Sequence, residues 1–252
     1  MTTARRPKAL GRRAARANRA SSIRAVLFDK DGTLIDFRAT WLPAYEKIVG
    51  ELFAAEGAAA DALLVAGGYH RASGRIDPRS VLAAGTNAEI AALWAGLVGI
   101  ADVAALAERI DLGFQAHARA GLVPVTDLAA LFGRLRGRGL GLGVATNDSA
   151  RALHDQLDLL GIAGLVDFAA GYDSGHGAKP DPGMVDAFCA RLGLAPREVA
   201  VVGDSRHDLD MARAAGAGLA IGVLTGASPR AELAAHADHI LDSVAELESL
   251  LG

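Results

Sequence analysis

The stretch at residues 24–35, RAVLFDKDGTLI, constrains the fold of this chain more than any other. It begins as a short apolar run, Ala25 to Phe28, of the kind that forms a strand buried inside a parallel sheet. The run ends in Asp29 and Asp31, and a glycine follows at once. Two carboxylates at the mouth of a sheet are unfavourable unless a cation or a proton lies there. The stretch therefore predicts a cation-binding strand end, with an ordinary acidic Asp-Gly turn as the alternative.

Beyond residue 119 the chain alternates short apolar runs with amphipathic stretches. Strands are expected at 140–146, 165–170, 199–203, 219–223 and 240–242, and helices at 126–136, 149–160, 182–192 and 204–215. Strands that alternate with helices form right-handed βαβ units and a parallel sheet. Residues 23–36 and 119–252 therefore predict an α/β core, a Rossmann-like parallel sheet flanked by helices.

The block between these parts, residues 37–118, shows helical spacing only. Helices are expected at 40–56, with Thr40 as the N-cap, and at 58–66, 81–84, 87–98 and 101–118. Residues 67–78 are rich in glycine and polar groups and are expected to form a loop. The pattern predicts an all-helical domain inserted after the first strand.

Composition and charge limit the class of protein. The chain is 51% hydrophobic and 22% charged, which is typical of a globular protein, and no apolar run has the length of a membrane span. Its single cysteine, Cys189, excludes an intrachain disulfide. Because the first 22 residues lack the apolar segment of a secretory signal, we expect a cytoplasmic protein. Nothing in the sequence indicates the oligomeric state.

Residues 1–22 are expected to form a basic, disordered arm. They contain seven basic residues and no acidic one, and removing those seven positive charges from the net charge of −3 leaves −10 for the remainder. Such an acidic body suits divalent cations and disfavours nucleic acid, so we expect no nucleic-acid partner and no membrane association. A transit peptide and a nonspecific phosphate-binding arm are the alternatives for this segment.

Polar side chains follow the expected strands at one edge of the sheet. Asp29, Thr146 and Asp204 each stand where a strand ends, and ligands of parallel sheets bind beyond these ends. Asp208 lies one helical turn after Asp204, and Lys179 lies in a loop. Carboxylates suit Mg²⁺, while a hydroxyl and an ammonium can bind anionic oxygens. This is the equipment of phosphoryl transfer.

Four motifs together resemble, in order and spacing, those of the haloacid dehalogenase superfamily. They are Asp29-Lys-Asp31-Gly-Thr-Leu, Val144-Ala-Thr146-Asn147, Ala178-Lys179-Pro180 and Gly203-Asp204-Ser-Arg-His-Asp208. The resemblance runs from about residue 23 to the end and implies that superfamily's core fold. The block at 37–118 matches the position of the inserted helical cap, as in the phosphoglycolate phosphatase-like group.

The resemblance implies a role for the first pair of acids. Asp29 would be the nucleophile, would form an aspartyl-phosphate and would ligate Mg²⁺. Asp31 would be the acid/base and would offer its backbone carbonyl to the metal. Members that dehalogenate carbon lack this second Asp, so its presence favours phosphate chemistry. Lys30 occupies a position that varies in the family and is given no role.

The remaining motifs carry the other implied roles. Thr146 and Lys179 would bind phosphate, and Lys179 would also offset the charge of Asp29. Asp204 would ligate Mg²⁺, with Asp208 supporting the metal directly or through water. Asn147 is expected either to contact phosphate or to cap the following helix.

The expected function is a Mg²⁺-dependent phosphatase acting on a small phosphorylated metabolite. Phosphoglycolate is the first candidate, on the resemblance of the cap alone. In the cap, Arg71 and Arg75 flank a glycine-rich bend and could bind a substrate carboxylate or a second phosphate; an exposed basic turn is the alternative. A sugar phosphate mutase of the same superfamily and a non-enzymatic, partner-binding role that uses the basic arm are the alternative functions.

Overall fold

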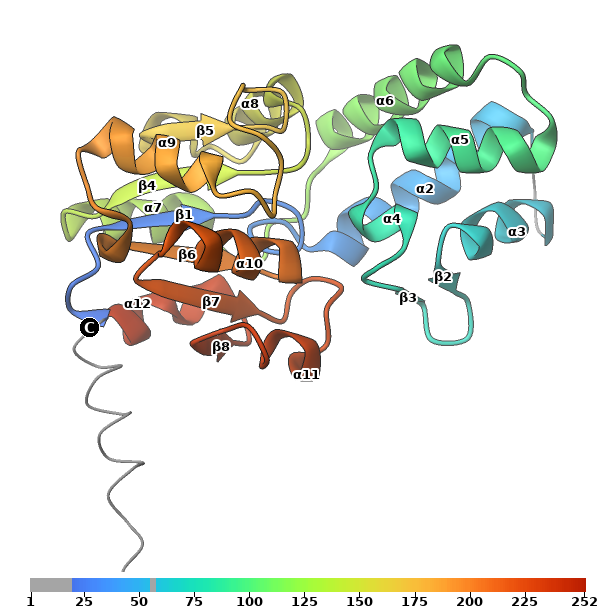
Figure 1. Ribbon diagram of the computed structural model, residues 1–252. Helices are drawn as coiled ribbons and strands as arrows, with labels where there is room; N and C mark the ends of the chain where they lie inside the picture. The colour runs from blue at the N-terminus through green and yellow to red at the C-terminus, as the bar shows by residue number, and fades with distance from the viewer. Residues whose placement is uncertain (1–19, 55–57) are drawn as a thin grey trace, which may run out of the picture.

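The computed structural model describes residues 20–54 and 58–252, which form two lobes (Figure 1). The larger lobe is built on a parallel six-stranded sheet of order β5-β4-β1-β6-β7-β8. Its strands are β1 (Ala25–Phe28), β4 (Gly141–Ala145), β5 (Phe168–Ala170), β6 (Val199–Gly203), β7 (Leu219–Val223) and β8 (His239–Leu241). β1 lies between β4 and β6, and its four residues are buried, as the continuous apolar run predicts. The α/β core fold is confirmed.

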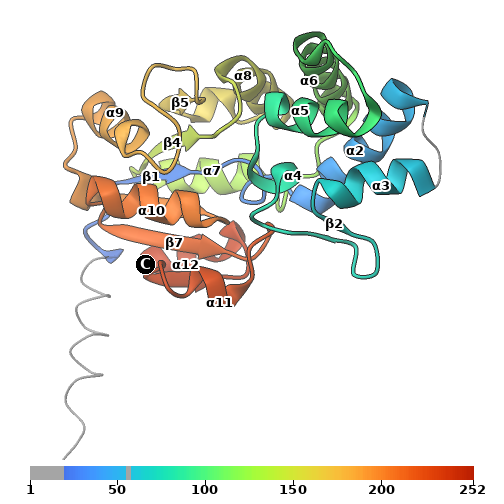
Figure 2. The ribbon, with the colours of Figure 1, turned by 45° about the vertical axis from the view of Figure 1, so that its right-hand side comes forward.

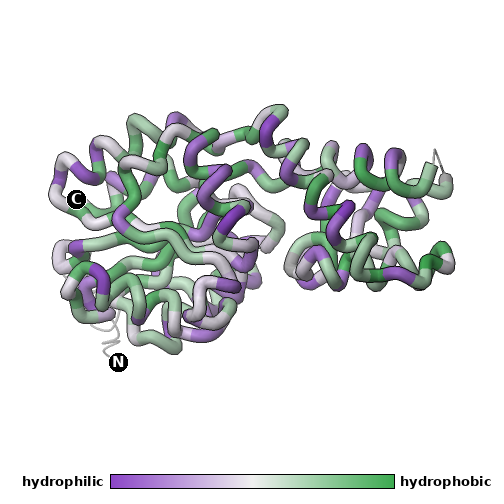
Figure 3. The backbone as a smooth tube through the Cα atoms, turned by 90° about the horizontal axis from the view of Figure 1, so that it is seen from above, coloured by the Kyte–Doolittle hydropathy of each residue, from purple (hydrophilic) through white to green (hydrophobic). Residues whose placement is uncertain are grey.

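Helices cover both faces of this sheet (Figures 1 and 2). They are α7 (Leu128–Gly137), α8 (Ala150–Leu159), α9 (Gly183–Leu192), α10 (Arg206–Ala215), α11 (Arg230–Leu233) and α12 (Leu247–Leu251), with the 3₁₀ turns η1 (Ala163–Leu165), η2 (Pro196–Glu198) and η3 (Val244–Glu246). Two apolar clusters result, one on each face: Phe132 and Leu153 pack in the first, and Phe188 and Leu209 in the second. Figure 3 shows that hydrophobic stretches of the backbone run through the middle of this lobe.

The smaller lobe, here called the cap, lies between β1 and α7 in the sequence. It contains α2 (Phe37–Phe53), α3 (Ala58–Ala66), β2 (Tyr69–His70), β3 (Arg75–Ile76), α4 (Val81–Ala84), α5 (Asn87–Val98) and α6 (Val103–Ala120). Its own apolar cluster includes Trp94, which is fully buried, and Ile110. Among the described residues no single helix has the length and hydropathy of a membrane span; α5 and α6 meet that test only as a pair, bent by 120°.

Two local expectations in the cap are wrong. β2 and β3 form a small antiparallel hairpin within residues 67–78, where a strandless loop is expected, because Tyr69 and Ile76 pair and are buried at the edge of the cap cluster. The N-cap of α2 is Asp36, whose Oδ1 accepts from the Ala39 backbone N–H at 2.9 Å. Thr40 lies inside the helix, and its hydroxyl oxygen accepts from the Val123 N–H at 3.0 Å.

The chain passes between the lobes twice, and the two crossings are hydrogen-bonded to each other. The Asp36 N–H donates to the Val123 carbonyl at 2.8 Å, and the Val125 N–H donates to the Leu34 carbonyl at 3.0 Å. The cap is therefore joined to the core at the carboxyl end of β1, beside the edge of the sheet where Asp29 lies.

Candidate active site

The carboxyl ends of β4, β1 and β6 meet at one edge of the sheet and carry polar side chains. Asp29 directly follows β1, Thr146 follows β4 and Asp204 follows β6. All three side chains are buried. Because these strands are parallel and adjacent, the sheet order alone brings Asp29 close to residues that follow it by more than a hundred positions.

Three carboxylates and one ammonium form the centre of the site. Oxygen atoms of Asp29, Asp204 and Asp208 all lie within 4.8 Å of one another. The Lys179 Nζ lies 2.6 Å from Asp29 Oδ1 and 2.6 Å from Asp208 Oδ1. Asp208 also accepts from the Ser205 N–H at 3.1 Å, so it caps the start of α10 as well as pairing with the lysine.

Burial controls the proton affinity of this centre. It raises the pKa of Asp29 to about 6, and the attraction of Lys179 only partly opposes this effect. The pKa of Asp204 is raised well above its usual value, first by burial and then by the charges of Asp29 and Asp208. Burial disfavours the charged form of Lys179, but the two carboxylates that it contacts raise its pKa above the ordinary value. Three carboxylates thus share one ammonium, and burial favours a bound proton on Asp29 and on Asp204.

The residues present fit a divalent cation. Asp29 Oδ2 is buried and has no hydrogen-bond partner, which leaves a carboxylate oxygen free to bind a ligand. Asp204 is held by the Ala227 N–H, which donates to its Oδ2 at 3.1 Å. A methyl group at Gly32 or Gly226 would collide with the Asp204 carboxyl, so both positions keep the backbone close to it. An all-oxygen donor set of this kind suits Mg²⁺.

A second group of residues can bind an anion beside the carboxylates. The Thr146 hydroxyl oxygen accepts from the Asp148 N–H at 3.1 Å, which leaves its own O–H to donate. Asn147 pairs with the backbone of Lys179: its Nδ2 donates to the Lys179 carbonyl at 3.1 Å, and its Oδ1 accepts from the Lys179 N–H at 2.8 Å. Asn147 thus positions the loop that carries the lysine. The helix that follows is capped by Ser149 instead, which accepts from the Ala152 N–H at 3.2 Å.

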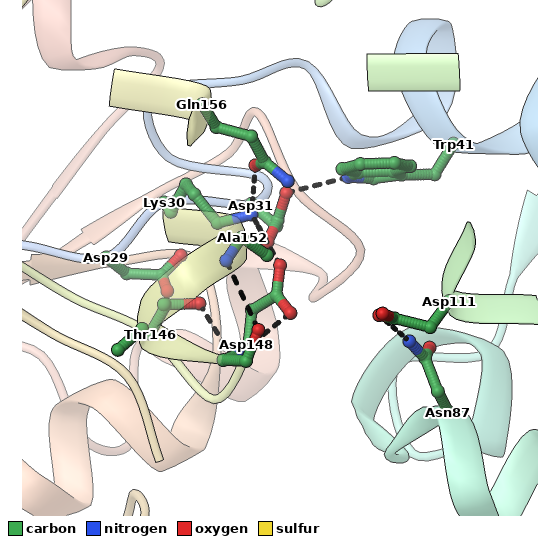
Figure 4. A network of polar contacts seen from close by, with 12 residues as sticks. Asp29, Lys30, Asp31, Trp41, Asn87, Asp111, Thr146, Asp148, Ala152 and Gln156 are labelled. Atoms are coloured by element: carbon green, nitrogen blue, oxygen red, sulfur yellow. Dashed lines mark hydrogen bonds and ion pairs between the residues drawn. The ribbon is translucent and has the colours of Figure 1, made fainter. Parts of the chain in front are cut away.

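The carboxylate of Asp31 lies apart from the three others, within a separate network (Figure 4). Its Oδ1 accepts from the indole Nε1 of Trp41, on α2 of the cap, at 2.7 Å. Its Oδ2 lies 2.6 Å from the Nζ of Lys30, which is fully buried. The same ammonium contacts Asp148 at 3.2 Å and donates to Gln156 Oε1 at 2.5 Å. The sequence assigns no role to Lys30, but in the structure its ammonium holds Asp31, Asp148 and Gln156 together.

A cavity of about 470 Å³ lies between the core and the cap. The residues that line it include both acidic groups and the anion-binding side chains: Asp29, Asp31, Thr146, Lys179, Asp204 and Asp208. This volume is within the range of small-molecule sites. The cap side of the cavity comes from α2, α4, the turn before α5 with the first residues of that helix, and α6. Ser228, in the loop after β7, also borders it. This loop holds Asp204 through Ala227, and the one sequence signal for it is Gly226, which comes shortly after a buried strand.

The structure does not bring the two cap arginines to this cavity. Arg71 is exposed and pairs with Asp61 inside the cap. Arg75 lines a separate hollow of about 300 Å³ together with Pro229 and Glu232 of the core. Neither Arg71 nor Arg75 is among the residues that line the main cavity, so their expected contact with the substrate stays a prediction that this arrangement does not support.

Comparison with known proteins agrees with this geometry. The family model for haloacid dehalogenase-like hydrolases matches residues 23–216. A phosphoglycolate phosphatase from Yersinia pseudotuberculosis is 31% identical over 235 residues, which cover 92% of this chain and 94% of that protein.

Solved structures match over nearly the full length. A predicted phosphoglycolate phosphatase from Haemophilus somnus superposes with a TM-score of 0.70 at 19% identity, covering 92% of this chain and 99% of that one. A proposed β-phosphoglucomutase from Thermotoga maritima gives 0.69 at 21% identity, covering 91% and 98%. At these identities the structures show the fold alone. The family model and the Yersinia relative show more: the chain belongs to the haloacid dehalogenase-like hydrolases and, among them, to the phosphatases of the phosphoglycolate phosphatase-like group.

Proposed function

We propose that this protein is a Mg²⁺-dependent phosphatase that hydrolyses the phosphate monoester of a small metabolite through a phosphoryl-enzyme intermediate on Asp29. The observation that carries the proposal is the convergence of Asp29, Asp204 and Asp208 with Lys179 in a cavity under the cap. Phosphoglycolate, the substrate in the names of the relatives, is the reference ester. A bound Mg²⁺, held by Asp29, Asp204 and Asp208, would neutralise charge on the phosphate oxygens.

In the first step, a carboxylate oxygen of Asp29 attacks phosphorus and the P–O bond to the alcohol breaks. Asp31, which lines the same cavity, donates a proton to the departing oxygen. Lys179 offsets the charge of Asp29, and Thr146 donates a hydrogen bond to a phosphate oxygen. In the second step, Asp31 accepts a proton from a water that attacks phosphorus, and this frees Asp29 and phosphate.

The test is release of inorganic phosphate from p-nitrophenyl phosphate with Mg²⁺ and with a chelator. We expect activity only with the metal, and we expect Asp29→Asn to abolish it. Asp158→Asn, an exposed acid outside the cavity, is the matched control and should keep full activity. Mass spectrometry of acid-quenched protein should find the phosphoryl group on Asp29. Full turnover by Asp29→Asn would contradict the assignment of the nucleophile.

Product analysis separates this proposal from a mutase. A phosphatase releases inorganic phosphate from a hexose monophosphate, whereas a mutase returns an isomeric monophosphate and retains the phosphate. The partner-binding alternative depends on the arm at 1–22, and its residues 1–19 lie outside the described part of the chain.

A further inference from the structure

The two walls of the cavity differ in chemistry. The core wall holds the acidic centre and Lys179, while the cap wall combines aromatic rings with polar side chains. The aromatic part is Phe37, Trp41, Tyr45 and Phe114. The Phe114 ring lies edge-on to the rings of Trp41 and Tyr45, at centroid distances of 5.6 and 5.2 Å. The polar part is Thr86 and Asn87 together with three residues of α6: Glu108, Asp111 and Gln115.

Asp111 is fixed in place without being neutralised. The Asn87 side-chain amide donates to its Oδ1 at 3.0 Å, and the Gln115 amide donates to its Oδ2 at 2.6 Å. Both donors are neutral, and a carboxylate can accept about four hydrogen bonds. Figure 4 shows Asp111 on the cap, facing Asp31 and Asp148 from the opposite side. Asp111 therefore presents a held negative charge, with acceptor capacity to spare, to the space where the leaving alcohol would lie.

The cap wall offers nothing that binds an anion by charge. Among the described residues, none of the cap residues that line the cavity is Lys, Arg or His. Over the whole lining there are seven carboxylates, one histidine on the core side, His207, and one lysine, Lys179, which already contacts Asp29 and Asp208. A substrate carboxylate directed at α6 would meet Glu108 and Asp111 with no ion-pair partner, and burying an unpaired charge is strongly unfavourable.

We propose that the leaving alcohol of the substrate carries hydroxyl or ammonium hydrogen-bond donors and no negative charge, and that Asp111 accepts from one of these donors. The aromatic rings of Trp41 and Phe114 fit the same chemistry, because ring faces attract cations and pack against C–H surfaces. This inference rests on the proposed phosphatase function and specifies its substrate class. Phosphoglycolate, whose leaving group carries a carboxylate, would be a poor substrate.

The test compares kcat/KM within two matched pairs of esters. Ethanolamine phosphate and phosphoglycolate share a two-carbon skeleton, and glycerol 3-phosphate and 3-phosphoglycerate share a three-carbon one. We expect the ester without the carboxylate to be preferred by at least about tenfold in one pair or both. A preference in the first pair means that the site favours an ammonium group over a carboxylate, and a preference in the second means that it favours a terminal hydroxyl group over a carboxylate. A preference for the carboxylate in both pairs would overturn the inference.

Variants show whether Asp111 causes the preference. Asp111→Asn keeps the shape of the side chain, and we expect it to shrink the preference at least about fivefold, through weaker turnover of the donor-bearing ester. Glu46→Gln removes the same charge from an exposed cap position outside the cavity and should leave the preference unchanged. An unchanged preference in Asp111→Asn refutes the role of this residue. If neither the wild-type protein nor the two variants hydrolyse p-nitrophenyl phosphate with Mg²⁺, the proposed phosphatase function is itself wrong.

Discussion

Lys30 uses all three donors of its ammonium on the groups around it. Its Nζ lies 2.6 Å from Asp31, 3.2 Å from Asp148 and 2.5 Å from Gln156. The centroid of the Trp41 ring lies 5.6 Å from the same atom. Burial disfavours its charge, but the neighbouring carboxylates raise its pKa above the ordinary value. The residue thus joins the first loop of the core to α8 and orients the carboxylate expected to act as the acid.

We expect Lys30→Met to lower the free energy of unfolding by about 2 kcal/mol, because it leaves two partly buried carboxylates without their partner. Chemical denaturation measures this loss. Lys47→Met is the matched control, since Lys47 is exposed and lies 3.8 Å from Glu51; its effect should stay within about 0.5 kcal/mol. Equal stability of the two variants would contradict the network described here.

The raised pKa of Asp29 predicts how metal binding depends on pH. Without metal its pKa moves from 3.8 to about 6, so the folded state binds more protons than the unfolded state between these values. The stability that this group contributes is therefore lost as pH rises through that window. Mg²⁺ binds the ionised form and must displace a proton at low pH. The increase in Tm on adding MgCl₂ should be larger at pH 8 than at pH 5.

Thermal unfolding of Asp29→Asn provides the control for this prediction. The variant lacks one of the two carboxyl groups whose pKa is raised and keeps the other, Asp204, so its smaller Mg²⁺ effect should change less between the two pH values. A wild-type shift that is the same at both pH values would show that Asp29 is not a ligand.

Among the elements, the loop between β7 and α11 comes close to Asp204 at Gly226, so the proposed metal site depends on this glycine as well as on Gly32. A methyl group at Gly226 would overlap the Asp204 carboxyl. We expect Gly226→Ala to weaken Mg²⁺ binding at least tenfold while the fold is retained, as measured by calorimetry and circular dichroism. Gly133→Ala, on α7 with no atom near the added methyl group, should bind Mg²⁺ normally. Normal binding by both variants would show that Asp204 is not a ligand.

Elements with strong periodicity were predictable, and short or paired ones were not. The buried run at β1 and the helix at α5 have patterns that local sequence determines. The β2–β3 hairpin has strands of two residues, too short for any alternation to be visible, and it forms because Tyr69 and Ile76 pack on the cap cluster. The hairpin places Arg75 outside the main cavity, and this position therefore depends on tertiary packing that the local sequence does not show.

The same limit holds for the site. The clustering of Asp29 and Asp204 follows from strand order in a parallel sheet, which motifs at strand ends reveal. The contacts of Lys30 and Asp111 follow from how α8, α5 and α6 lie around the cavity, and no short motif encodes that arrangement.

At the scale of the whole molecule, the cavity lies between the core and the cap, and both contribute residues to its lining. Because residues 20–54 and 58–252 already supply the acidic centre and both walls of the cavity, we expect deletion of residues 1–19 to change kcat/KM for p-nitrophenyl phosphate by less than about twofold. Steady-state kinetics of the full and the shortened chain measure this. A large loss of turnover would assign these residues a part in catalysis, whereas loss of a bound partner at unchanged turnover would support the partner-binding role.

The hydrogen bond from Trp41 to Asp31 gives the molecule an optical reporter of its own. The chain has two tryptophans, and the other, Trp94, is fully buried in the cap, where its Nε1 donates to the Leu63 carbonyl at 3.1 Å. Indole emission follows the polarity and charge around the ring, so only Trp41 would register the arrival of a phosphate ester. A Trp94→Phe protein would thus let the approach of cap and core be timed by fluorescence, with no dye attached.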